Sequence, residues 1–339
     1  MPSTSSHRLR HWPLVLLLLA CAGCGETRPV PEDDSAGKIV RPPAAVSLQL
    51  NWFPEAEHGG VFSADVHELY DDAGLDVEIR PGGPGVQVIT QVATGRVLFG
   101  VTNADRVLVG HAAGAKTVAV MAAMQVSPRC VMVHENSGID SLEKLGQVSS
   151  LAVSSTATWS LFLQKKVDLS GVQLVPYAGN VTQFLLDDDF AQQGYSISEP
   201  FVARQKSVRP RVLMVSDLGF NPYTSVLITT PEVIKTRPEL VTAMVRASIA
   251  GWQKYLDDPS QTNQAIHERN EEMGLPILAF GAKELQELCS TEDTPRKQLG
   301  QMSEARWKTL LDQLVEVEAI KPGAVNVSET FTNRFLESD

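Results

Sequence analysis

Residues with aromatic, amide or carboxylate side chains follow several expected strands in the first third of the chain. Trp52 follows a strand in a loop held by Pro54, so its indole would stack on a planar ring unless it belongs to the hydrophobic core. His58 begins the next expected helix and would either contact a ligand or cap that helix. Asn103 and Asp105 follow a later strand, although Asp105 would equally serve as an ordinary helix cap. These residue types at strand ends indicate a binding cleft.

The middle of the chain carries a second set of candidates. Ser154, Ser155 and Thr156 lie between an expected strand and a helix start, where hydroxyl and backbone N–H groups would hold an oxyanion or a carbonyl oxygen. Tyr177 offers a second aromatic face and Asn180 offers an amide. All five would bind a ligand from the side opposite Trp52.

Two charged residues complete the polar candidates. Glu199 follows a buried strand and is the best candidate for polar recognition, with a salt bridge to Arg204 or Lys206 as the alternative. Arg129 would either grip an anion or form a structural ion pair between two lobes.

The sequence lacks the patterns of catalysis, metal binding and nucleic-acid binding. No nucleophile elbow or HExxH motif is present, and the body beyond residue 45 has no CxxC pair, so we expect neither an enzyme nor a bound metal or cofactor. The chain has 40 acidic against 29 basic residues and no cluster rich in lysine and arginine, which makes nucleic acid a poor partner. Cys130 and Cys289 would form a disulfide or stay reduced and buried, and burial is favoured.

The N-terminus has the pattern of an export signal. A basic start precedes the apolar run 12–20, which is about as long as a signal-peptide core (~7–15 residues) and too short for a membrane-spanning helix of ~20 residues. The run ends at Cys21 and Cys24, each preceded by small residues as in a bacterial lipobox, so Cys21 or Cys24 would be lipidated; an ordinary secretory signal is the alternative. Residues 1–20 are therefore expected to be a lipoprotein signal peptide, and the polar residues 21–45 a flexible tether.

The remaining body alternates strands and helices twice and then becomes helical. Its length of about 290 residues favours two lobes over a single core. The alternation predicts an α/β fold with parallel strands and right-handed crossovers, in which residues 46–125 plus 226–335 form one lobe and residues 128–222 the other. Within it, residues 58–73 predict one helix and residues 194–197 a strand. A ligand would bind between the lobes at the carboxyl ends of the strands.

Two crossings would connect the lobes and act as a hinge. The first lies near residues 126–128 and is flanked by Gln125 and Arg129, and the second lies near residues 218–223. Asn221 and Tyr223 on the second crossing would line the cleft or only stiffen the hinge.

Three segments of the chain, residues 50–64, 70–77 and 92–101, resemble the NMT1/THI5-like (SsuA/THI5-like) family of periplasmic binding proteins. The pattern W-x-P-x-x-x-H-x-G, which runs from Trp52 to Gly60 and includes His58, is the most specific part and is similar to the pyrimidine-precursor and riboflavin branches. The resemblance implies the two-lobed type II periplasmic-binding-protein fold. The family's eukaryotic pyrimidine synthases carry a cysteine-rich motif that this chain lacks.

The resemblance also implies a function. Together with the lipobox, it predicts a lipid-anchored receptor on the periplasmic side of a membrane, which delivers a small molecule to an ABC permease and its ATPase. We expect a monomer, because closure of the cleft requires no partner. The expected ligand is a flat nitrogen heterocycle, first a thiamine pyrimidine precursor, whose amino edge would pair with Glu199, and second riboflavin. Sulfonate or nitrate is less favoured because Arg129 is the only basic residue placed in the cleft. A pyrimidine-precursor enzyme and a ligand-sensing adaptor are the alternative classes.

Overall fold

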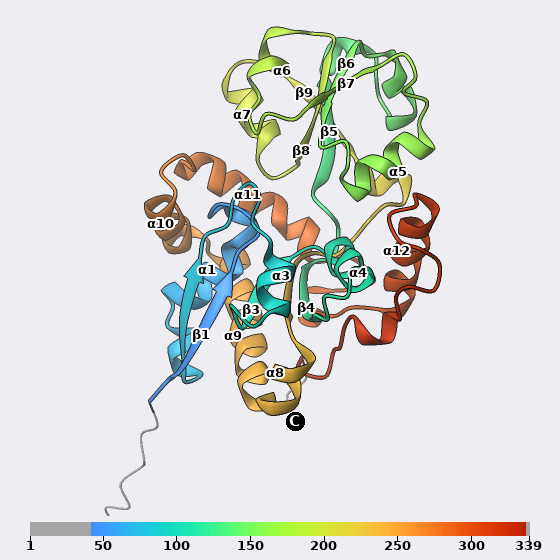
Figure 1. Ribbon diagram of the computed structural model, residues 1–339. Coiled ribbons are helices and arrows are strands. Elements are labelled where there is room, and N and C mark those ends of the chain that lie inside the picture. Colours follow the sequence, from blue (N-terminus) through green and yellow to red (C-terminus); the bar gives the residue numbers. More distant parts are fainter. Residues whose placement is uncertain (1–41, 337–339) are drawn as a thin grey trace, which may run out of the picture. The chain divides into compact units, whose positions relative to one another are not determined.

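The computed structural model describes residues 42–336 (Figure 1). The predicted signal peptide, both cysteines predicted as lipidation sites (Cys21 and Cys24) and all but the end of the predicted tether lie outside these residues. No helix within residues 42–336 is both long enough and apolar enough to cross a bilayer.

The first of two five-stranded sheets has the strand order β2-β1-β3-β10-β4. Its strands are β1 (Ala44–Gln49), β2 (Leu75–Arg80), β3 (Phe99–Thr102), β4 (Val118–Met124) and β10 (Thr224–Thr229). Strand β1 pairs in parallel with β2 and β3, whereas β10 runs antiparallel to both β3 and β4.

The second sheet has the order β7-β6-β8-β5-β9. Its strands are β5 (Arg129–His134), β6 (Ser150–Val153), β7 (Gln173–Pro176), β8 (Phe190–Tyr195) and β9 (Pro210–Met214). Strand β6 pairs in parallel with β7 and β8, and β5 runs antiparallel to β8 and β9. The α/β class is confirmed, but parallel pairing is wrong for β5 and β10. Each of these strands enters its sheet from the other one without a crossover helix, so nothing requires it to run parallel.

The helices around the first sheet place the loop that follows β1. They are α1 (Gly59–Val66), α2 (Leu69–Asp72), α3 (Val88–Ala93), α4 (Ala104–Ala112), α8 (Pro231–Thr236), α9 (Pro238–Asp257), α10 (Ser260–Arg269) and α11 (Leu275–Cys289). Helix α1 packs closely on α9, because a Cβ at Gly60 would lie only 2.1 Å from the Trp252 ring. The single helix predicted over residues 58–73 is wrong, since Glu68 adopts φ 58° and separates α1 from α2.

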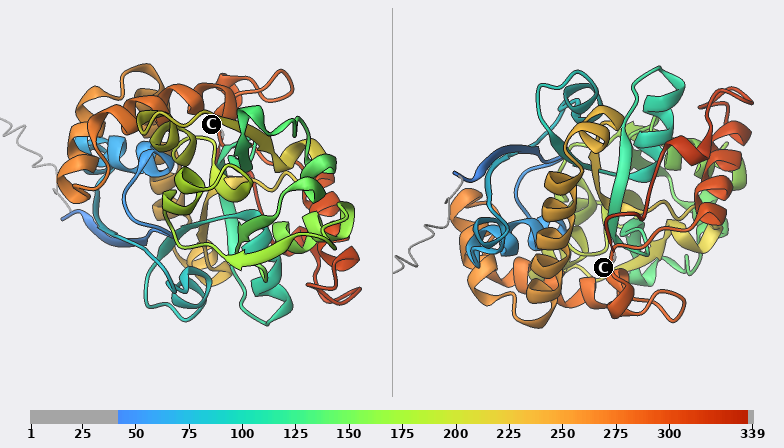
Figure 2. Two further views of the ribbon diagram at one scale, coloured as in Figure 1. Left: turned by 90° about the horizontal axis from the view of Figure 1, so that it is seen from above. Right: turned by 90° about the horizontal axis from the view of Figure 1, so that it is seen from below.

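The second sheet carries α5 (Thr158–Lys166), α6 (Thr182–Leu186) and α7 (Glu199–Gln205). Strand β8 lies at 190–195, earlier than the predicted 194–197, and α7 was not predicted. The C-terminal helix α12 (Glu304–Glu316) packs against α4 and α5, and both views of Figure 2 show it apart from the orange helices α10 and α11. The 3-10 turns are η1 (Ala56–His58), η2 (Glu135–Ser137), η3 (Leu142–Gln147), η4 (Val215–Leu218), η5 (Arg296–Gln298) and η6 (Val327–Glu329).

The two sheets are joined by the crossings at 125–128 and 215–223. The amide oxygen of Asn221 accepts a hydrogen bond from the backbone N–H of Ser127 at 2.8 Å, which ties one crossing to the other. The domain boundaries stay a prediction. Cys130 and Cys289 are buried free thiols, which confirms the expectation of burial without a disulfide.

Candidate functional site

Side chains from both sheets meet at the ends of β1, β3, β5 and β8. The amide of Asn103, after β3, donates a hydrogen bond to the hydroxyl of Tyr195, at the end of β8, at 3.2 Å. The hydroxyl of Thr158, the first residue of α5, donates to a carboxylate oxygen of Asp105 in α4 at 2.5 Å. We call the residues around these two contacts the inter-sheet cluster: Asn51, Glu55, Glu57, His58, Asn103, Asp105, Arg129, Thr158, Trp159, Tyr177, Tyr195 and Glu199.

The loop between β1 and α1 contributes a buried hydrogen-bonded chain to the cluster. The amide of Asn51 donates to Oε1 of Glu57 at 2.7 Å, and Nε2 of His58 lies 2.9 Å from Oδ1 of Asn51. Because Oδ1 is an acceptor, this network assigns the ring proton to Nε2 and makes Nδ1 an acceptor. Burial lowers the pKa of His58 to about 3, so the ring is neutral at physiological pH.

Glu55 and Glu57 form an acidic pair beside this chain. The two residues are 7% and 1% exposed, and their carboxyl groups lie close enough for each to shift the pKa of the other. Burial, followed by the charges of Glu57 and Glu199, raises the pKa of Glu55 well above its ordinary value. Burial also raises the pKa of Glu57, although the Asn51 amide and the Arg129 charge oppose the shift. Two buried carboxyls this close hold one proton between them more easily than two negative charges.

Arg129, on β5, provides the cation of the cluster. Its guanidinium lies 4.2 Å from the ring centroid of Tyr195 and 5.3 Å from that of Trp159, both within the range of a cation–π contact. Within residues 42–336 the guanidinium has neither a hydrogen bond nor an ion pair, so the predicted inter-lobe ion pair is wrong. Its N–H donors remain available to a ligand.

Glu199 opens α7 and is held by neighbours of its own sheet. Its Oε1 accepts from the Tyr177 hydroxyl at 2.7 Å, and its Oε2 accepts from the backbone N–H of Tyr195 at 2.8 Å and from the Ser198 hydroxyl at 2.5 Å. The alternative salt bridge with Arg204 is wrong, because that guanidinium lies over the ring of Phe280 instead. Lys206 likewise forms no ion pair among the described residues.

Three buried acceptor atoms of the cluster lack a hydrogen-bond partner within the described part of the chain: Nδ1 of His58, Oδ1 of Asn103 and Oδ1 of Asp105. Buried polar atoms normally find partners, so each of these is a place where another molecule's donor would fit. The cap alternative is wrong for Asp105, because the cap position of α4 belongs to Asn103. His58 does occupy the cap position of α1, but its side chain forms no cap hydrogen bond there.

Other predicted residues lie outside the cluster. Trp52 is partly exposed, which excludes the core alternative, and its ring meets that of Phe53 edge-on at 5.5 Å. The turn formed by Ser154, Ser155 and Thr156 is exposed, and the backbone N–H of Ser154 donates to the side chain of Gln193 at 2.7 Å.

Three predicted residues hold the crossings and their surroundings instead of reaching the cluster. Gln125 is buried and donates to the backbone oxygen of Gln301 at 3.1 Å. The hydroxyl of Tyr223, also buried, accepts from the backbone N–H of Ser303 at 2.9 Å. Together with the Asn221 contact to the first crossing, these bonds favour a stiffening role.

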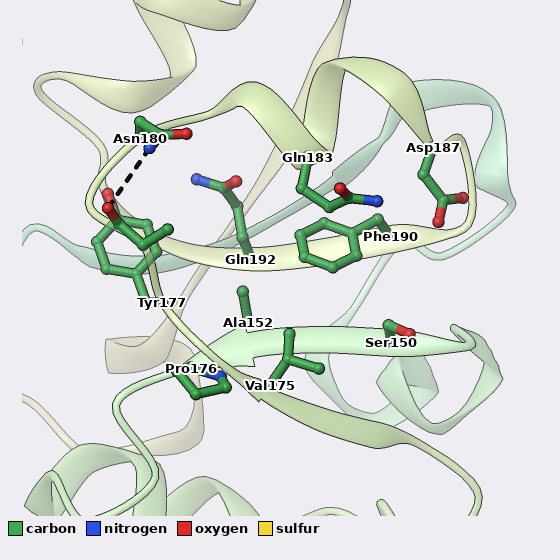
Figure 3. A pocket seen from close by; sticks show the side chains of 11 residues that line it. Ser150, Ala152, Val175, Pro176, Tyr177, Asn180, Gln183, Asp187, Phe190 and Gln192 are labelled. Atoms are coloured by element: carbon green, nitrogen blue, oxygen red, sulfur yellow. Dashed lines mark hydrogen bonds between the residues drawn. The ribbon is translucent and has the colours of Figure 1, made fainter.

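Tyr177 and Asn180 line a separate pocket of about 330 Å³ on the second sheet (Figure 3). Its lining comes from β6, β7, β8, α6 and their loops: Ser150, Ala152, Val175, Pro176, Tyr177, Ala178, Asn180, Gln183, Asp187, Phe190 and Gln192. This volume is at the small end of the range for ligand pockets. Tyr177 alone belongs to both the pocket and the inter-sheet cluster, through its bond to Glu199.

The acidic pair and the aromatic rings near Arg129 were not among the site residues predicted from the sequence. Glu55 and Glu57 lie within the W-x-P-x-x-x-H segment, between apolar stretches on both sides, and that context was a signal for buried carboxylates. Trp159 and Tyr195 carried no comparable signal, because their contact with Arg129 depends on how the second sheet folds.

Comparison with known proteins agrees with this architecture. The family model described as NMT1/THI5 like matches residues 55–262. The riboflavin-binding protein RibY of Chloroflexus aurantiacus is 23% identical over 336 residues, covering 95% of each chain. The periplasmic aliphatic sulphonate binding protein SsuA from Escherichia coli superimposes with a TM-score of 0.66 at 16% identity, covering 85% of this chain and 91% of its own. The desulfurization enzyme DSZB gives a TM-score of 0.58 at 14% identity, covering 86% and 97%. The periplasmic-binding-protein fold is thereby confirmed, and the ligand is not determined by it.

Proposed function

Because this chain belongs to the NMT1/THI5-like family, we propose that it is the solute-binding receptor of an ABC-type importer. It is exported and anchored by lipid on the periplasmic side of the membrane. It binds one small molecule in the inter-sheet cluster, as a monomer, and delivers it unchanged to the permease and its ATPase. The binding proteins among its relatives support this role.

The ligand is a flat nitrogen heterocycle that is rich in hydrogen-bond donors, such as a pyrimidine precursor of thiamine. The observation that carries this proposal is the set of buried acceptors without partners: Nδ1 of His58, Oδ1 of Asn103 and Oδ1 of Asp105. Amino groups and ring N–H groups supply donors to such atoms, whereas sulfonate and nitrate supply none.

The charges of the cluster also disfavour an anion. The charges of Arg129 and Glu199 both act on the carboxyl groups of Glu55 and Glu57, so three carboxyl groups share the neighbourhood of one guanidinium. An anionic ligand would be drawn to Arg129 and repelled by the carboxylates, so it would gain little from binding there.

Riboflavin is the second candidate because the relative RibY is a riboflavin-binding protein that aligns over nearly the whole chain. Its isoalloxazine ring is also planar, and its ring N–H and ribityl hydroxyls are donors. It is larger than a pyrimidine, and the inter-sheet cluster would have to open further to admit it.

Equilibrium dialysis of the full chain in detergent tests the proposal, with an aminopyrimidine precursor of thiamine, riboflavin, methanesulfonate and nitrate as ligands. We expect the pyrimidine to bind in a one-to-one complex and to be recovered unchanged by mass spectrometry. Binding of methanesulfonate or nitrate alone would refute the heterocycle assignment. Conversion of the pyrimidine into a product would show an enzyme instead of a receptor, as the fold shared with DSZB allows.

A further inference from the structure

We propose that the inter-sheet cluster selects a ligand with a positive charge, and that this charge replaces one proton held between Glu55 and Glu57. The inference rests on the proposed function, because it concerns the ligand of the same cluster. The group recognised would be an amidinium, an ammonium or the protonated ring of an aminoheterocycle.

The acidic pair has no cation of its own. Within residues 42–336, neither carboxylate forms an ion pair with a lysine or arginine, and the nearest basic group is Nε2 of His58, 3.5 Å from Glu57. That ring is neutral and its Nε2–H group donates a hydrogen bond to Oδ1 of Asn51, so it brings no charge to the pair. Glu55 and Glu57 are nevertheless almost completely buried.

The other charged groups that face the pair come from two further elements. Arg129, on β5, attracts both carboxylates, and Glu199, at the start of α7, repels them. Arg129 is held between the rings of Tyr195 and Trp159 instead of against a carboxylate. Glu55 also lines a small cavity together with uncharged residues: Ile197, Ser198, Met273, Ile277 and Leu278.

These surroundings leave more negative than positive charge. If the three carboxyl groups of the pair and Glu199 were all ionised, Arg129 would balance one of the negative charges. The other two would lie unpaired in a dry site, which is strongly unfavourable. One shared proton removes one of these charges, and burial accordingly raises the pKa of both Glu55 and Glu57. A ligand cation placed against the pair would remove the need for that proton.

The proton balance depends on the ligand that enters. When a permanently charged amidinium binds, the O–H bond of the shared carboxyl breaks and the proton passes to the buffer. When a neutral aminopyrimidine binds, the same proton moves to a ring nitrogen, where a new N–H bond forms, and none reaches the solvent. In both cases the complex holds two carboxylates against one cationic ligand.

Calorimetry of the full chain with benzamidinium and benzamide tests the exchange, because these probes share one planar shape and differ in charge. Titrations in phosphate and in Tris at one neutral pH measure the protons released from the difference in buffer ionisation enthalpy. We expect benzamidinium to bind at least about tenfold more tightly than benzamide and to release about one proton per ligand. Glu55→Gln should release none, whereas the exposed control Glu292→Gln should behave as wild type.

Infrared difference spectra test the shared proton without any ligand. At neutral pH the wild-type chain should show the carbonyl band of a protonated carboxylic acid, which Glu55→Gln or Glu57→Gln removes and Glu292→Gln retains. Absence of that band in the wild type, or its persistence in both variants, overturns the inference. So does benzamidinium binding no tighter than benzamide, or without proton release. Any of these results leaves the receptor proposal intact if the aminopyrimidine still binds in equilibrium dialysis. If no heterocycle binds in that dialysis experiment, the receptor proposal itself is refuted.

Discussion

The hydrogen bond from Thr158 to Asp105 joins α5 of the second sheet to α4 of the first, so it should stabilise the conformation in which the two sheets meet around a ligand. In Thr158→Val the shape is kept and the hydroxyl is lost. The other oxygen of Asp105 already has no partner in the described chain, so in the variant neither oxygen of this buried carboxylate would accept a hydrogen bond from a described side chain. When the sheets separate, water can take the place of the Thr158 hydroxyl on Asp105. The substitution therefore destabilises the ligand-bound form and not the open form.

The size of the affinity loss follows from the strength of this one hydrogen bond. Hydrogen bonds to a charged group contribute about 1.5–3 kcal/mol, so the dissociation constant of the ligand should rise about ten- to hundredfold. Calorimetry with the aminopyrimidine measures it, with the exposed helix residue of Thr309→Val as the matched control.

A double-mutant cycle with Asp105→Ala shows whether the two side chains act together. In the Asp105→Ala background, Thr158→Val should reduce the affinity for the ligand much less than in the wild type, because the partner of the hydroxyl is already absent. An equal loss in both backgrounds, or an unchanged dissociation constant in Thr158→Val with the fold intact, would refute the reasoning.

Three further predictions concern stability and the protonation of the loop after β1. The raised pKa of Glu55 means that the folded state holds a proton that the unfolded chain releases; wild-type stability should therefore fall as pH rises above the ordinary glutamate pKa, and urea unfolding of Glu55→Gln should show a weaker fall. His58 has the opposite sign: its pKa of about 3 means that stability falls as pH drops below the ordinary histidine pKa, and NMR titration should find a neutral ring at pH 5, where a charged ring would contradict the assignment. Gly60→Ala should destabilise the fold by about 1–3 kcal/mol or more because its Cβ would overlap the ring of Trp252; a loss below about 0.5 kcal/mol on urea unfolding would mean that α1 and α9 separate easily.

The fold was largely predictable because strands and helices with regular apolar spacing alternate along the chain. The chain alternates strands and helices and then, as predicted, becomes helical, ending in α9, α10, α11 and α12. The break at Glu68 was not predictable from spacing, because the apolar pattern continues through it and only the backbone turns. The antiparallel β5 and β10 depend on the path of the chain between two sheets, which local patterns do not contain.

The candidate site was predictable only in part. His58, Asn103, Asp105, Arg129 and Glu199 do lie in one cluster, since strand ends of both sheets meet there. The partners of Asn103, Asp105 and Arg129 were not predicted, because these contacts join residues that are close only after folding. The bond between Asp105 and Thr158 spans 53 positions of the chain, and the ring of Trp159, also in α5, lies near Arg129 of β5.

The most direct test of the account asks whether the ligand binds in the inter-sheet cluster or in the pocket of the second sheet. Calorimetry of the aminopyrimidine would compare the wild type with Asn103→Ala, which removes an acceptor of the cluster, and with Gln183→Ala, which trims the pocket wall. We predict a clear loss of affinity in Asn103→Ala and wild-type affinity in Gln183→Ala. The reverse result would contradict the account and place the ligand in the pocket lined by Tyr177 and Asn180.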